Sequence, residues 1–128
     1  MILVFGAALG LISVAFGAFA EHGLRDNVAE EKFRFLMTAV RYNQVHAVLI
    51  SAIGLALLSE VRPAHNMQAV KWSGVLFTAG TILFSFSIYF SVTLGVPAFL
   101  SITPFGGITL IAAWALLLFA GLAALRKN

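Results

Sequence analysis

The side chains best suited to chemistry lie at the two borders of one connection between apolar stretches. Glu21 and His22 follow the first stretch, and Arg41, Tyr42 and His46 begin the second. A carboxylate and two imidazoles could act as acid and base or as three metal ligands. An arginine beside a protonated histidine could contact a lipid phosphate. No H-x-x-E-H or H-E-x-x-H spacing supports the metal site.

A structural brace is the interpretation that the position of His46 favours. Tyr42 and His46 lie one turn apart on the same side of a helix, so His46 falls a turn inside an apolar stretch. A polar residue there is costly without a partner, and the nearest candidates are Tyr42, Glu21 and His22. We rank a brace first, contact with a lipid or another anion second, and a metal or catalytic site third.

The composition identifies the class of protein in which these residues act. Hydrophobic residues make up 61% and charged residues 10% of the 128-residue chain, against about 45–50% and about 25% in soluble domains. The sequence therefore predicts an integral membrane protein. The absence of cysteine excludes disulfides and cysteine-ligated metals, and we expect no tightly held redox cofactor. The formal charge of +3 includes no basic run of the kind that binds nucleic acid, so we expect membrane lipids to meet the basic residues.

Four apolar stretches are long enough to cross a bilayer, which takes about 20 residues per helix. They are residues 1–20, 42–59, 72–94 and 106–125. Backbone groups in lipid must be hydrogen-bonded within the chain, so we predict an all-α, four-helix transmembrane bundle forming a single domain over residues 1–128. No basic region precedes the first stretch, and we expect it to be retained as a span rather than cleaved as a signal peptide.

The first connection carries a helical pattern of its own. Between residues 27 and 41, apolar side chains recur at helical spacing: Ala29, Phe33, Leu36, Met37 and Val40. Asn27 followed by Glu30 is typical of a capping box, and Glu30 with Arg34 is a favourable i,i+4 pair. We predict an amphipathic helix at the membrane interface between the first two spans. The alternative is a continuous helical extension of the second span.

Small residues predict how the spans pack, because they let helix backbones approach closely in lipid. They recur at helical spacing in three spans: Gly6, Gly10, Ser13 and Gly17; Asn43, Ala47, Ser51 and Gly54; Gly74, Thr78, Thr81 and Ser85. At the start of the fourth span, Thr103 is the expected N-cap, Pro104 follows it, and Gly106 and Gly107 allow close approach. We expect these stripes to be helix contacts within a bundle that could also dimerise, with a pore lining as the alternative.

Four blocks of sequence at these positions resemble a known family. They are Gly17-Ala18-Phe19-Ala20-Glu21-His22, Arg41-Tyr42-Asn43-Gln44-Val45-His46-Ala47, Leu83-Phe84-Ser85-Phe86-Ser87-Ile88-Tyr89, and Thr103-Pro104-Phe105-Gly106-Gly107 followed by Trp114. In order and spacing they are similar to the YgdD-like family of small inner-membrane proteins, a domain of unknown function that includes transmembrane-protein-256-like proteins. Ala20, Glu21 and Phe86 depart from its pattern. The resemblance implies a four-span protein of the bacterial inner membrane and supplies no reaction.

These observations together predict a non-enzymatic accessory or scaffold component that acts through helix–helix and lipid contacts, within a larger membrane complex or a homo-oligomer. The alternative is a binding site for a small molecule, lipid or metal, with or without enzymatic activity, at Glu21, His22, Arg41, Tyr42 and His46. A channel or transporter is disfavoured, because the middle of every span lacks Asp, Glu, Lys and Arg.

The orientation depends on basic residues, which gather on the cytoplasmic side of membrane proteins. Four belong to each face: Arg62, Lys71, Arg126 and Lys127 on one, and Arg25, Lys32, Arg34 and Arg41 on the other. Arg126 and Lys127 directly adjoin the end of the fourth span, whereas the other set is interleaved with acidic residues. We therefore predict both termini in the cytoplasm, with the His22–His46 region facing outward.

Overall fold

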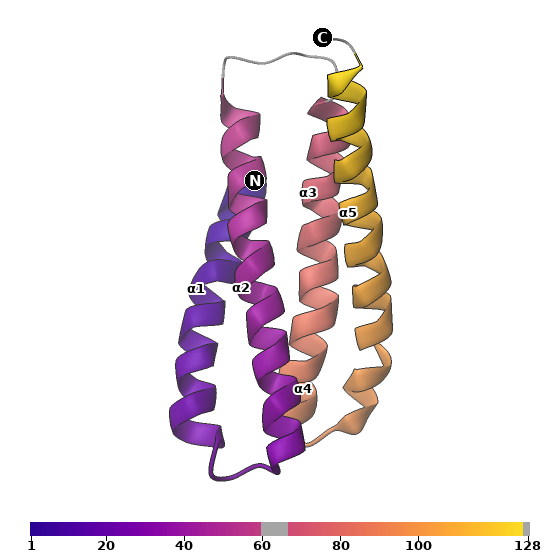
Figure 1. Cartoon of the computed structure of the whole chain (residues 1–128). Coiled ribbons are helices and arrows are strands. Elements are labelled where there is room, and N and C mark those ends of the chain that lie inside the picture. The colour runs from indigo at the N-terminus through magenta and orange to yellow at the C-terminus, as the bar shows by residue number, and fades with distance from the viewer. Residues whose placement is uncertain (60–66, 127–128) are drawn as a thin grey trace.

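The computed structural model describes residues 1–59 and 67–126, and the regular elements in that part of the chain are helices. They are α1 (Ile2–Phe19), the π-helix η1 (Ala20–Leu24), α2 (Glu30–Leu58), α3 (Met67–Thr81), the π-helix η2 (Ile82–Phe86), α4 (Ser87–Leu94), the 3-10 helix η3 (Pro97–Ser101) and α5 (Thr103–Leu125). They form four rods in antiparallel order: α1–η1, α2, α3–η2–α4 and η3–α5 (Figure 1). We call the end with the α1–α2 connection the lower end and the end with the C-terminus the upper end, as in Figure 1.

Three of the rods are long and apolar enough to cross a membrane. They are Ile2–Leu24, Met67–Leu94 and Pro97–Leu125. The remaining rod, α2, has 29 residues, but charged and polar side chains up to His46 lower the hydropathy of its first half. The chain is thus an all-helical membrane protein with three candidate spans in its described residues.

The segment between residues 27 and 41 is not a separate helix. Most of it belongs to α2, which continues without interruption to Leu58, so the structure shows the alternative of a continuous extension. The apolar stripe of this extension faces the bundle: Leu36 and Val40 are 0% and 1% exposed and pack with Ala20, Ile88 and Tyr89. Leu36 and Val40 are therefore buried against neighbouring helices, while Phe33 and Met37 are half-buried beside them.

Two predicted helix caps are wrong. The N-cap of α2 is Ala29, which has no side-chain cap bond, while Asn27 Nδ2 donates to the Gly23 carbonyl at 2.9 Å. The N-cap of α5 is Ile102, and the hydroxyl of Thr103 instead meets the Ser87 hydroxyl at 2.7 Å. Asn27 lies two positions before the N-cap of α2, and the hydroxyl of Thr103, the first residue of α5, is used in a contact with another helix.

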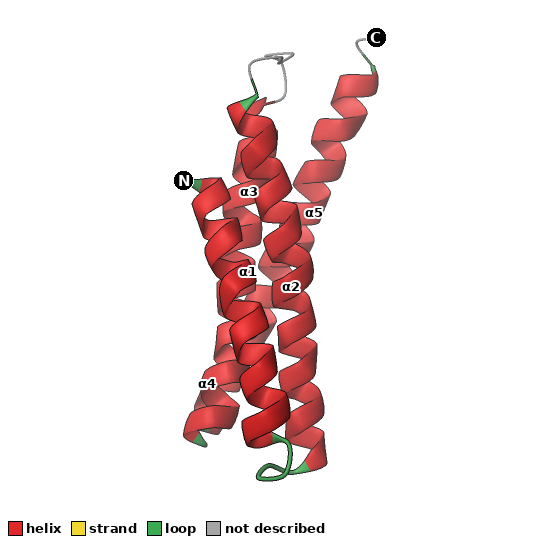
Figure 2. Ribbon diagram, turned by 90° about the vertical axis from the view of Figure 1, so that its left-hand side faces the viewer, coloured by secondary structure: helices red, strands yellow, loops and turns green. Residues whose placement is uncertain are grey.

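The bundle consists of two close helix pairs joined through α2 and α3. The first pair is α1 with α2 and the second is α3 with α5. Glycine permits close approach in each pair: a Cβ on Gly6 would overlap the Ser51 backbone, and a Cβ on Gly80 of α3 would overlap Leu110 of α5. A Cβ on Gly106 would overlap the backbone of Phe84 in η2. Gly107, by contrast, has open space where its Cβ would lie. α2 and α5 both pack on the third rod but not along each other, and Figure 2 shows the upper end of α5 leaning away from α2.

Candidate functional site

The structure does not bring the five predicted polar residues into one cluster. Glu21 and His22 lie in η1 at the lower end, where His22 is exposed. Glu21 accepts an ion-pair hydrogen bond from Arg25 at 2.8 Å, and it lines a surface groove with Arg41 among others. His46 instead lies inside the bundle, only 5% exposed.

Both ring nitrogens of His46 are engaged. Nδ1 lies 2.7 Å from the Tyr42 carbonyl oxygen, and Nε2 lies 3.4 Å from the indole Nε1 of Trp114. A carbonyl can only accept and an indole N–H can only donate. The ring that satisfies both is therefore neutral, with its proton on Nδ1.

Aromatic rings enclose this histidine. It stacks on Phe77 with centroids 5.5 Å apart, and Trp114 meets Phe77 edge-on at 5.0 Å. Tyr42 covers the lower side of His46 at 5.8 Å and stacks on Phe84 at 4.6 Å. His46 thus ties α2 to α3 and α5 through a packed aromatic group.

Trp114 was not predicted as the partner of His46. The signal available in the sequence is its position: Trp114 lies well inside the last apolar stretch, whereas tryptophans that anchor a span lie at its ends. An indole N–H inside the apolar layer requires an acceptor, and His46 is a polar residue at a comparable depth that requires a donor.

A second polar layer crosses the bundle below His46. Asn43 Nδ2 donates to the Tyr89 hydroxyl at 3.3 Å, and Ser85 Oγ donates to the Ala39 carbonyl at 2.9 Å. All four side chains are buried. Because Ser85 bonds Ala39 across antiparallel helices, the residues one turn away, Thr81 and Asn43, are expected at a similar level. Thr81 is the last residue of α3, directly before η2. Asn43 Oδ1 and Thr81 Oγ1 are buried without a hydrogen-bond partner among the described residues.

The described residues contain no group of three His, Cys, Asp or Glu side chains arranged to hold a metal ion. Glu21 and His22 occupy η1, and His46 contacts Tyr42, Phe77 and Trp114 instead. The metal interpretation of these three residues therefore lacks the necessary geometry. The arrangement around His46 is that of a hydrogen-bonded contact between helices.

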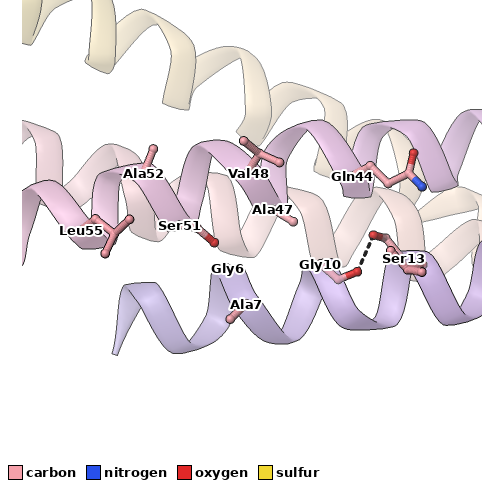
Figure 3. Close-up of a pocket in the computed structure, with 11 residues that line it drawn as sticks. Gly6, Ala7, Gly10, Ser13, Gln44, Ala47, Val48, Ser51, Ala52 and Leu55 are labelled. Carbon is pink, nitrogen blue, oxygen red and sulfur yellow. Dashed lines mark hydrogen bonds between the residues drawn. The ribbon is translucent and has the colours of Figure 1, made fainter.

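The predicted small-residue stripe of α1 faces a groove along α2. The groove has a volume of about 570 Å³ and is lined mostly by small or apolar side chains from both helices. Figure 3 shows Ser51 pointing from α2 toward Gly6, with Gly10 and Ala47 further along. Ser13 donates to the Gly10 carbonyl of its own helix at 2.7 Å, so its hydroxyl does not face the groove as a free donor. At the lower end of the same α1 stripe, a Cβ on Gly17 would meet Val40 of α2. In the third rod, a Cβ on Gly74 would contact Ile53 and Ile2, and the Thr78 hydroxyl donates to the Gly74 carbonyl.

Comparison with known proteins gives consistent results. The sequence profile of the family described as "Protein of unknown function (DUF423)" matches residues 16–107. The UPF0382 inner membrane protein YgdD of Escherichia coli (strain K12) is 32% identical over 126 residues, covering 98% of this chain and 92% of the relative. A UPF0382 membrane protein of Staphylococcus epidermidis is 31% identical over 120 residues, covering 94% and 93%. The UPF0382 membrane protein YwdK of Bacillus subtilis (strain 168) is 30% identical over 118 residues, covering 92% and 93%. No solved structure matches the chain.

These names place the relatives in membranes and assign no reaction to them. The match extends over nearly the whole chain, so it includes both the residues around His46 and the helix-packing glycines. It confirms the resemblance that the four sequence blocks indicated. The chain belongs to the DUF423 family of membrane proteins of unknown function.

Proposed function

We propose that the chain crosses the bacterial inner membrane four times, with α2 as the fourth crossing beside the three candidate spans. The four antiparallel rods and the location of both termini toward the upper end support this proposal (Figures 1 and 2). From Tyr42 to Leu58, α2 rises about 25 Å at 1.5 Å per residue, close to the hydrocarbon thickness of about 30 Å. Relatives named inner membrane proteins support the location.

In this arrangement the lower boundary of the hydrocarbon lies near Arg41 and Glu21. These two residues line one surface groove, so they lie at a similar depth. The first three turns of α2 then extend beyond the hydrocarbon beside η1. The upper boundary lies near Lys71 and Arg126, and we place both termini in the cytoplasm.

Within that membrane bundle, we propose a non-enzymatic accessory or scaffold role through helix–helix and lipid contacts. The observation that carries this proposal is the state of His46, the residue best suited to chemistry by type and position. Both of its nitrogens are used in bonds that join helices, so no lone pair or proton remains for a substrate. The exposed faces of the rods are apolar side chains, as contacts with lipid or another helix require.

Photo-crosslinking in intact membranes tests the role. A photoreactive phenylalanine analogue is placed at Val48 or Ile111, which are 72% and 70% exposed. We expect a discrete protein adduct, from a second copy or another subunit, at one of the two positions. The same analogue at Phe77, which is 0% exposed, is the control and forms no intermolecular adduct. Adducts with lipid alone at both exposed positions would contradict a scaffold role through these faces.

The alternative, a small-molecule or lipid site, is supported for only part of the predicted set. Arg41, Tyr42 and His46 line one groove, together with Val45 and Trp114. Glu21 and His22 do not line it. A channel or transporter role stays disfavoured by the uncharged middle of the apolar stretches.

A further inference from the structure

A groove of about 300 Å³ separates α2 from α5 at the level of His46. Arg41, Tyr42, Val45, His46 and Trp114 line it. Tyr42 and Trp114 are 44% and 47% exposed, whereas His46 lies at the bottom. At Trp114 this groove meets a second one of about 540 Å³, which follows the leucines of α5 toward the upper end. The two form an apolar path along the outside of the bundle.

The hydrogen-bonding capacity of the lining residues determines which kind of ligand the groove can bind. Its deepest polar residue, His46, has no free hydrogen-bonding atom, because Tyr42 and Trp114 occupy both nitrogens. Beyond Arg41 and Tyr42 at one end, the remaining walls are Val45 and the Trp114 ring. In this deeper part a polar group would lose its water without gaining a hydrogen bond, whereas an acyl chain requires none.

One end of the groove is charged. Arg41 is exposed and makes no ion pair or hydrogen bond within residues 1–59 and 67–126. Its other side borders the surface of Glu21, Glu30 and Glu31, of which Glu21 is already paired with Arg25. Arg41 lies at the lower membrane boundary in the arrangement proposed above. A guanidinium at that depth is suited to a lipid phosphate.

We propose that this groove binds one anionic phospholipid, with its phosphate at Arg41 and one acyl chain along Val45 and Trp114. The proposal rests on the membrane placement of α2 proposed above. His46, whose Nε2 contacts Trp114, lies five positions after Arg41, about 7.5 Å along the helix axis. That separation matches a phosphate at the boundary and a chain lying deeper.

Fluorescence of Trp114 tests the proposal directly. The chain has two tryptophans, so Trp72→Phe leaves Trp114 as the only one. This variant is reconstituted into phosphatidylcholine vesicles. Increasing fractions of a lipid with brominated acyl chains, which quench indole on contact, are then included: brominated phosphatidylglycerol in one series and brominated phosphatidylcholine in the other. We expect brominated phosphatidylglycerol to bind beside Trp114 about fivefold more strongly, the factor that one basic residue contributes near an anionic lipid.

Two arginine variants in the Trp72→Phe background separate the site from general charge. Arg41→Gln is expected to abolish the preference for phosphatidylglycerol. Arg34 lines the neighbouring groove and not this one, so Arg34→Gln is expected to keep the preference for phosphatidylglycerol. Equal quenching by both lipids, or a preference that survives Arg41→Gln, would overturn the proposed site. Absence of quenching by either lipid would instead contradict the membrane placement of α2 and α5.

Discussion

His46 is held inside the bundle by two hydrogen bonds, one to the Tyr42 carbonyl of its own helix and one from the indole of Trp114 in α5. The sequence placed a polar side chain one turn inside an apolar stretch, where it must be hydrogen-bonded. Glu21 and His22 are the partners that the sequence suggests, because consecutive spans place the end of the first and the start of the second at the same membrane face. The actual donor, Trp114, is 68 positions away. A contact at that separation depends on which helices pack together, and hydropathy carries no such information.

The indole N–H of Trp114 leads to a prediction about stability. Trp114→Phe keeps an aromatic ring against Phe77 but leaves His46 Nε2 without its donor. We expect the free energy of unfolding to fall by about 0.5–1.5 kcal/mol, measured by thermal unfolding in mild detergent. Trp72→Phe, at an exposed position, is the control and should change it by less than about 0.5 kcal/mol. Equal melting of the two variants would show that the 3.4 Å contact contributes nothing.

Two buried hydroxyls of the third rod are expected to contribute differently to the free energy of unfolding. Ser85 Oγ donates to the Ala39 carbonyl across the helix pair, whereas Thr81 Oγ1 is buried without a partner among the described residues. Ser85→Ala removes an interhelical bond and should lower the free energy of unfolding by about 0.5–1 kcal/mol. Thr81→Val keeps the shape of the side chain and removes an unsatisfied group, so it should be neutral or stabilising. Chemical or thermal unfolding measures both variants. A larger loss of stability for Thr81→Val than for Ser85→Ala would contradict both assignments.

At the scale of the helices, each of the four apolar stretches falls within one rod, while several helix ends differ from the predicted limits. The second stretch was expected to begin at residue 42, but α2 begins at Glu30. Hydropathy indicates where a segment can lie in lipid and not where its hydrogen bonds begin. The interruption of the third rod by η2 was not predicted, because no proline marks it and its residues continue the apolar pattern.

The small-residue stripe of α1 can be resolved residue by residue. A Cβ at Gly6 would overlap the Ser51 backbone, whereas a Cβ at Gly10 would meet the Ala47 methyl at an ordinary 3.8 Å. Gly6→Ala must therefore push α1 away from α2, and we expect a loss of about 1–3 kcal/mol. Gly10→Ala should be neutral or stabilising, since alanine is the better helix former. Thermal unfolding of both variants in one detergent checks this, and similar losses would show that the two glycines are equally close to α2.

Across the whole molecule, the even number of antiparallel rods brings both termini to the upper end (Figures 1 and 2). Family membership was predictable from four sequence blocks, because their order and spacing extend over most of the chain. Counting basic residues does not decide which end of the bundle faces the cytoplasm, since four belong to each face. Of these, Arg62 and Lys127 lie outside the described residues. The structure adds that Arg25, in the lower set, is paired with Glu21.

The pairing of Arg25 with Glu21 and the position of Arg126 at the end of α5 favour an upper end in the cytoplasm. Because the chain contains no cysteine, single introduced cysteines test this orientation directly. Asp26→Cys places a thiol at the exposed lower connection, and Gln68→Cys places one at the exposed upper end of α3. We expect a membrane-impermeant maleimide to label Asp26→Cys in intact spheroplasts and to label Gln68→Cys only after permeabilisation. The opposite pattern would invert the orientation while keeping the fold. Labelling of both variants in intact spheroplasts would instead show that α2 does not cross the membrane.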